Sequence, residues 1–99
     1  MLKNFKTYQL SVQLYKECKE LALPGYLKDQ LLRAASSVTL NLSEGSARRT
    51  SKDRRRFYNM AFASLREVQS ILDLEIQDHS LAEMADKLGG GIYRLCERA

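Results

Sequence analysis

Several residue types that build functional sites are scarce in this chain. It has one histidine, two cysteines, one proline and no tryptophan among 99 residues. One histidine, His79, provides too few ligands for a typical zinc site, and Cys18 and Cys96 are too few for a disulfide framework. No run of about 18 apolar residues occurs, so no membrane-spanning helix and no membrane partner are expected.

The motifs that typically carry catalysis are also missing. His79 follows Glu75 by four residues, whereas the di-iron helix bundles place histidine three residues after glutamate. The glycine run at 89–91 lacks the Lys-Ser/Thr pair of a phosphate-binding loop. No serine or cysteine has an obvious histidine base, because His79 falls at a predicted helix junction. We therefore expect no catalytic residues, no metal, no cofactor and no enzymatic activity.

The length fits a single domain over residues 1–99, because about 100 residues can build one hydrophobic core. The N-terminal segment MLKNFKTYQL contains no apolar stretch of signal-peptide length. We therefore expect a cytoplasmic protein. The two cysteines fall on apolar faces and are expected to be buried thiols.

Apolar residues recur at spacings of three and four, the period of amphipathic helices. Four segments show this pattern: 6–23, 26 or 27 to 44, 52–77, and from 80 towards the end of the chain. No segment alternates with the two-residue period of a strand. Short connections favour antiparallel neighbours, so the sequence predicts an all-α, antiparallel (up-down-up-down) four-helix bundle.

Local signals predict how these helices begin and end. Gly45 is expected to end the second helix in a left-handed conformation, and Thr50 or Ser51 to cap the third. A capping box at Ser80-x-x-Glu83 is expected to begin the fourth helix. The glycines at 89–91 are expected to kink or split that helix, or to let a neighbouring backbone approach closely.

A polar stripe lies beside the apolar stripe of the second helix. With two polar residues of the third helix, it is the nearest approach to an active-site constellation. We interpret it as a structural hydrogen-bonded network, because charges at a bundle edge are usually paired. Arg33 is expected to pair with Glu44 or Glu67, so that Glu67→Ala would strand a partly buried guanidinium. The predicted structural network consists of Arg33, Ser37, Asn41, Glu44, Ser64 and Glu67.

Positive charge is concentrated in the first half of the chain. Residues 1–56 carry 12 Lys and Arg against 5 Asp and Glu, and residues 57–99 carry 4 against 7. A basic cluster spans the second connection and the start of the third helix, where free backbone N–H groups already favour anions. The cluster is either a phosphate-binding site or a solvated charged corner, and Arg56 alternatively turns inward beside the core. Its members are Arg48, Arg49, Lys52, Arg54, Arg55 and Arg56.

Four motifs give the chain a resemblance to a known family. They are Arg33-Ala34-Ala35, Asn41-x-x-Glu44-Gly45, Ser51-Lys52-Asp53 and the segment from Ala63 to Glu67. In these motifs the chain resembles the small four-helix-bundle proteins encoded in intervening sequences of bacterial large-subunit ribosomal RNA genes. It is more distantly similar to the accessory variability proteins of retroelements. The resemblance implies a four-helix bundle that assembles with itself, as a homopentamer.

Two functions from different classes remain open. In the first, the basic cluster binds the phosphate backbone of RNA or another nucleic acid, with little base readout because no stacking platform of exposed aromatics is evident. In the second, the protein is a self-assembling scaffold whose basic cluster pairs with acidic helix ends of a neighbouring subunit. An unidentified protein partner is also left open. The residues expected at the subunit interface are Leu32, Leu40, Phe62, Asp73 and Asp78.

Overall fold

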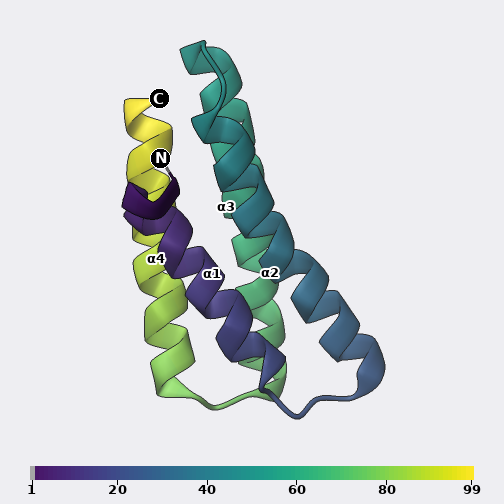
Figure 1. Ribbon diagram of the computed structural model, residues 1–99. Helices are drawn as coiled ribbons and strands as arrows, with labels where there is room; N and C mark the ends of the chain where they lie inside the picture. Colours follow the sequence, from purple (N-terminus) through teal and green to yellow (C-terminus); the bar gives the residue numbers. More distant parts are fainter. Residues whose placement is uncertain (1) are drawn as a thin grey trace.

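The computed structural model describes residues 2–99, which form four α-helices after one short 3-10 turn (Figure 1). The predicted all-α four-helix fold is therefore confirmed, and the described residues contain no strand. The molecule measures 40 × 22 × 21 Å along its principal axes. The elements are η1 (Leu2–Asn4), α1 (Lys6–Lys19), α2 (Gly25–Ser46), α3 (Ser51–Glu75) and α4 (His79–Arg98).

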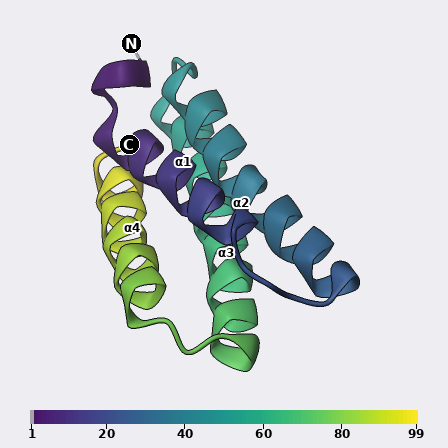
Figure 2. The ribbon, with the colours of Figure 1, turned by 60° about the horizontal axis from the view of Figure 1, so that its bottom comes forward.

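Consecutive helices run in opposite directions. On α2 and α3, Ser37 contacts Ser64 and the earlier Gln30 contacts the later Glu67, which is the order that antiparallel neighbours require. The α2–α3 connection lies at one end of the molecule, whereas the α1–α2 and α3–α4 connections lie at the other (Figure 1). Figure 2 shows α1 and α4 packed on the same side of the α2–α3 hairpin.

The core is built from the apolar stripes of all four helices. Burying one leucine, isoleucine or valine side chain contributes roughly 1.5–3 kcal/mol, so these residues supply most of the driving force for folding. The sequence places them at spacings of three and four, and therefore on one face of each helix. The largest fully buried side chains are Leu14, Leu31, Leu42, Leu65, Leu88, Ile92, Val38, Val68, Cys18 and Ser11.

Several helix ends differ from the sequence prediction, and α3 for example ends at Glu75 rather than at residue 77. The first helix ends at Lys19 rather than at residue 23, and the Nζ of Lys28 donates to the carbonyl of Leu21 in the segment that follows. The fourth helix is capped by Asp78, whose carboxylate accepts from the backbone N–H of Leu81 at 3.1 Å. The capping box predicted at Ser80 is therefore wrong. Of the two caps predicted for α3, the structure uses Thr50, which accepts from the N–H of Asp53.

Gly45 does not end α2, which continues to Ser46 without a left-handed residue. Instead, Gly45 is buried against α3. A Cβ at this position would lie 2.6 Å from a ring carbon of Tyr58, closer than non-bonded atoms can approach. Glycine is therefore required here by the neighbouring ring and not by backbone conformation.

The glycines at 89–91 do not break α4, which is continuous from His79 to Arg98. Of the outcomes predicted for this run, the structure shows a close approach, made by a side chain. A Cβ on Gly91 would lie 2.9 Å from the hydroxyl of Thr7 on α1. Within residues 2–99, no helix combines the length and the hydropathy needed to cross a bilayer.

Candidate nucleic-acid interface

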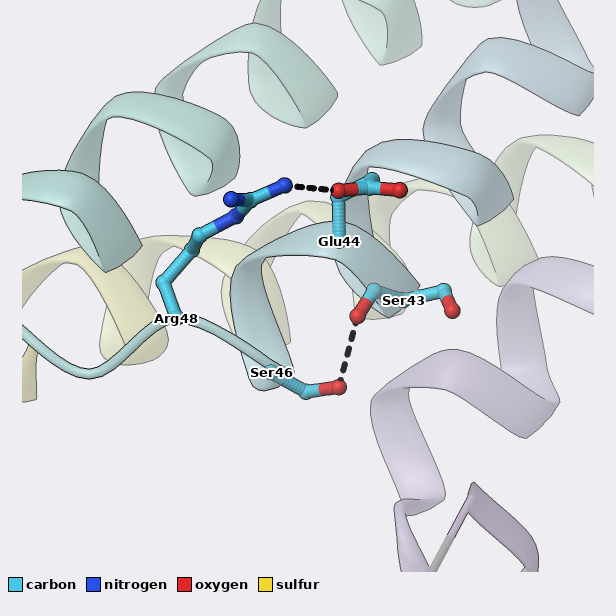
Figure 3. A network of polar contacts seen from close by, with 4 residues as sticks. All are labelled: Ser43, Glu44, Ser46 and Arg48. Atoms are coloured by element: carbon cyan, nitrogen blue, oxygen red, sulfur yellow. Dashed lines mark hydrogen bonds and ion pairs between the residues drawn. The ribbon is translucent and has the colours of Figure 1, made fainter.

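Arg48, the first residue of the basic cluster, is held by a contact with the last turns of α2. The hydroxyl of Ser46 donates to the carbonyl of Ser43 at 2.8 Å, closing the last turn of the helix. Arg48 folds back to form an ion pair with Glu44, one helical turn earlier (Figure 3). Both side chains are exposed, so the pair contributes little to stability, but it neutralises part of the charge of Arg48.

Arg54 braces the connection between α2 and α3. Its guanidinium donates to the carbonyl of Arg49 at 2.9 Å and to that of Arg48 at 3.3 Å. It also donates to the hydroxyl of Ser51 at 3.3 Å. Because a rigid planar donor ties three successive parts of the chain together, the connection has a defined path. Arg54 thus orders the loop and is itself only partly exposed.

Arg55 and Arg56 point in different directions although they are adjacent. Arg55 donates to the carbonyl oxygens of Cys96 and Ala99 at 3.3 and 3.4 Å, so it reaches across to the end of α4. Arg56 is exposed and does not turn inward, and its guanidinium carbon lies 4.5 Å from the ring centroid of Phe57. Arg48 lies over the same ring at 4.8 Å. Phe57 therefore supports two guanidinium groups through cation–π contacts.

Arg49 and Lys52 differ from the other members of the cluster. Both are exposed, and neither side chain has a hydrogen-bond, ion-pair or cation–π partner in residues 2–99. They lie in the last residues of the loop and in the first turn of α3, where the helix dipole adds partial positive charge. All six predicted cations thus gather at one corner of the bundle, which we call the basic corner. Arg49 and Lys52 are its two unengaged charges.

The structure assembles only part of the predicted polar network. Ser37 and Ser64 hydrogen bond across α2 and α3 at 2.8 Å, and the amide of Asn41 donates to the carbonyl and the hydroxyl of Ser37. Glu44 instead pairs with Arg48, and Glu67 accepts from Gln30 at 3.3 Å.

Arg33 stands outside this network. It is exposed, and no ion pair joins it to Glu44 or Glu67 within the described chain. The predicted pairing of Arg33 is therefore wrong, because its side chain is exposed to solvent and does not lie at the contact between α2 and α3. Glu67→Ala should consequently cost less than about 0.5 kcal/mol, the usual range for surface substitutions.

The residues predicted at a subunit interface lie in different surroundings. Leu40 is 63% exposed, whereas Leu32 and Phe62 are half-buried against the core. Asp73 is exposed, and Asp78 is engaged as the cap of α4. The structure also exposes large apolar side chains that the sequence pattern did not single out: Tyr26, Met60, Leu74 and Tyr93.

The two cysteine thiols are less acidic than a free thiol. Burial raises the pKa of the fully buried Cys18 to about 11, with a further contribution from the nearby Glu17 carboxylate. The predicted burial holds for Cys18 but not for Cys96, which is only half-buried at the end of α4. Partial burial still raises the pKa of Cys96, so both thiols are protonated at neutral pH. Within residues 2–99, no group of three or more metal-ligating side chains comes together, and His79 is exposed.

Comparison with known proteins identifies the family but no individual relative. No curated protein and no solved structure matches the chain significantly. One family model matches residues 3–95, nearly the whole length, and it describes the 23S rRNA-intervening sequence proteins. That match includes the Asn41-to-Gly45 segment, the basic corner and the Ser37–Ser64 contact. The chain therefore belongs to the 23S rRNA-intervening sequence protein family.

Proposed function

We propose that this chain is a non-enzymatic RNA-binding protein that holds phosphate groups at its basic corner. The observation that carries the proposal is the pair Arg49 and Lys52, exposed and unengaged at the N-terminus of a 25-residue helix. The name of the family links its members to ribosomal RNA genes and is consistent with an RNA ligand. Such a ligand would be met in the cytoplasm, where we place the protein.

The geometry of the corner suits a phosphate group. Arginine presents a planar fork of donors that matches phosphate oxygens, and Arg54 holds the loop so that Arg49 has a defined position. Cations at a helix N-terminus oppose the helix dipole and cost stability. Their placement there is consistent with selection for a ligand rather than for folding.

The test is a salt titration of binding. A labelled RNA hairpin and a matched DNA duplex are titrated with the protein at several salt concentrations. Wild-type affinity should fall steeply, because each phosphate contact adds about 0.9 to the slope of log K against log salt. The double variant Arg49→Ala/Lys52→Ala should lower that slope by about 2, one for each lost contact.

The matched control is Lys16→Ala/Lys87→Ala, which removes the same net charge from exposed sites on α1 and α4. Its slope should stay close to that of the wild type. If both double variants weaken binding equally, only the net charge matters and the basic corner is not a site. If the wild-type protein binds neither nucleic acid at low salt, the proposed function is wrong.

A second candidate function is self-assembly, favoured by a different surface. Tyr26 and Leu40 are exposed on α2, and Met60 and Leu74 on α3. Each pair is fourteen residues apart, nearly a whole number of helical turns, so its members share a face. These four residues form an outer face of the α2–α3 hairpin, turned away from the core. A second copy, in a homopentamer or another closed assembly, would cover it.

A further inference from the structure

A groove runs between α3 and α4 and begins at the basic corner. One hollow of about 290 Å³ is lined by Arg55, Asn59, Phe62, Tyr93, Cys96 and Glu97. A second, of about 430 Å³, includes Phe62 and Tyr93 again and continues to Gly89, Gly90, Arg66 and Arg94. Because the two hollows share both aromatic residues, they adjoin, and together we call them the α3–α4 groove.

Two aromatic rings line the groove from opposite helices. Phe62 on α3 is half-buried, and the guanidinium carbon of Arg66 lies 4.8 Å from its ring centroid. Tyr93 on α4 is 58% exposed, so much of its ring is open to solvent. Every nucleobase has a flat face, so exposed rings of this kind bind bases by stacking without selecting a sequence. The expectation of no stacking platform is thus revised by Tyr93.

Two glycines leave the floor of the groove open. A Cβ on Gly90 would meet only the flexible end of Arg94, at 3.5 Å, and one on Gly89 would make an ordinary contact with Leu65. Packing therefore does not require glycine at positions 89 and 90. At position 91 it does, because a Cβ there would lie too close to Thr7. Each glycine nevertheless costs the helix about 1 kcal/mol relative to alanine. What the missing side chains provide is space between the two rings.

The charges around the groove favour an anion over a neutral ligand. Arg55, Arg66 and Arg94 face it, against the acids Asp86 and Glu97. Gln69 links two of these charges, since its amide oxygen accepts from Arg66 at 2.9 Å and its amide nitrogen donates to Asp86 at 3.1 Å. Three cations against two acids leave the groove with a net positive charge. Arg55 belongs both to the groove and to the basic corner, seven residues before Phe62 and about 10 Å along α3.

We propose that the α3–α4 groove receives unpaired bases of a single-stranded RNA whose phosphates lie on the basic corner. Tyr93 stacks on the bases beside Phe62, whose ring carries the Arg66 guanidinium, and Arg66 and Arg94 contact the phosphates. The inference rests on the proposed RNA-binding function and adds its substrate class, since a base paired within a duplex cannot enter between the rings. It also assigns Tyr93 as the residue that makes the protein bind single strands more tightly than duplexes.

The experiment compares a labelled oligouridylate of about 12 nucleotides, a length typical of single-strand sites, with an RNA duplex of equal length. Tyr93→Ala should weaken binding of the single strand about tenfold or more, the effect of losing one stacked base, and leave duplex binding unchanged. Tyr93→Phe keeps the ring and should restore wild-type affinity. Gly90→Leu, which fills the groove while favouring the helix, should reproduce the loss.

The control is Tyr26→Ala, which removes a more exposed ring, 74% against 58% for Tyr93, from α2, outside the groove. Because Tyr26 also lies on the outer face of the α2–α3 hairpin, the variant's particle mass is recorded in the same buffer, and at the wild-type mass the variant should bind both RNAs as the wild type does. If Tyr93→Ala binds single strands normally while Arg49→Ala/Lys52→Ala does not, the groove inference is overturned and the proposed function stands. If the wild type binds no RNA, both fail. If Tyr93→Ala weakens single-strand and duplex binding together and also lowers the particle mass, the groove is a contact between copies, and the inference is again overturned.

Discussion

At the scale of single residues, the glycine at position 45 is explained by the close packing of α3 against it. The space that a Cβ would need is filled by Tyr58 and by the Cβ of Phe57, at 2.6 and 3.2 Å. Gly45→Ala should therefore lower the free energy of unfolding by about 1–2 kcal/mol, because the cost of overpacking exceeds the gain in helix propensity. Urea denaturation followed by circular dichroism measures the change.

Gly90→Ala is the matched control, since it lies in a helix and its Cβ meets no crowded neighbour. It should raise the free energy of unfolding by about 0.5–1 kcal/mol. Equal effects of the two substitutions would show that Tyr58 does not impose the glycine at position 45.

Cys18 makes stability depend on alkaline pH. Burial raises its pKa from 9.0 to about 11 in the folded protein. Below pH 9 the thiol is neutral in both states. Between pH 9 and 11 the unfolded chain loses the proton first, so stability should fall by about 2–3 kcal/mol over this range. Urea midpoints at pH 8 and 11 test this, and Cys18→Ala should show a smaller decline. The same decline in the variant would exclude Cys18 as the cause.

The sequence predicts the basic corner as a group but not the role of each member. Arg54, Arg55 and Arg56 are consecutive, yet one braces the loop, one reaches α4 and one lies over Phe57. Successive residues on a helix are turned by 100°, so neighbours in sequence face different partners. Only Arg55 has its partner on another helix, and that contact depends on how α3 and α4 pack, which a single sequence does not reveal. Arg54 contacts the adjoining loop, and Arg56 contacts the neighbouring Phe57 on the same helix.

At the scale of elements, the caps of α3 and α4 give a direct comparison. Asp78 and Thr50 each accept a hydrogen bond from a free backbone N–H at 3.1 Å. Asp78→Ala and Thr50→Ala should each cost about 1 kcal/mol of stability, the usual loss when a capping side chain is removed. Ser80→Ala, which removes the residue first expected as the cap, should cost less than about 0.5 kcal/mol. A larger loss for Ser80→Ala than for Asp78→Ala, measured by thermal unfolding, would contradict this assignment.

The existence and type of the four helices follow from the sequence, whereas several ends do not. Apolar spacing is a property of whole segments and survives small errors, but an end depends on one or two local hydrogen bonds. At the end of α1, Leu21 and Leu23 continue the apolar pattern although the helix has stopped at Lys19. Pro24 disfavours helical backbone at the residue before it, and Lys28 captures the carbonyl of Leu21.

At the scale of the whole molecule, opposite charges lie at opposite ends. The basic corner is at the α2–α3 connection, whereas Asp73 and Asp78 are near the α3–α4 connection (Figure 1). Pairing of these ends in a neighbouring copy would add subunits along the long axis. Contact through the outer face of the α2–α3 hairpin would instead set them side by side. The two modes of self-assembly therefore predict different sensitive residues.

We expect Leu40→Asp to lower the particle mass in solution, measured by light scattering, because it places a charge within the outer face. Ala82→Asp adds the same charge at an exposed site in the first turn of α4 and should leave the mass unchanged. If only Arg49→Ala/Lys52→Ala lowers the mass, the copies associate end to end. If none of the variants changes a monomeric mass, the self-assembly proposal fails.

The α2–α3 hairpin also has a consequence for folding kinetics. These two helices share the most extensive contact in the molecule, and only a short turn around Arg48 and Arg49 separates them. Contacts between segments close in sequence have a low entropic cost of closure, so such a hairpin forms early. Ser64→Ala should then slow refolding, whereas Ala85→Gly on α4 should mainly speed unfolding. The basic corner would be the first part of the molecule to take shape and the last to be lost.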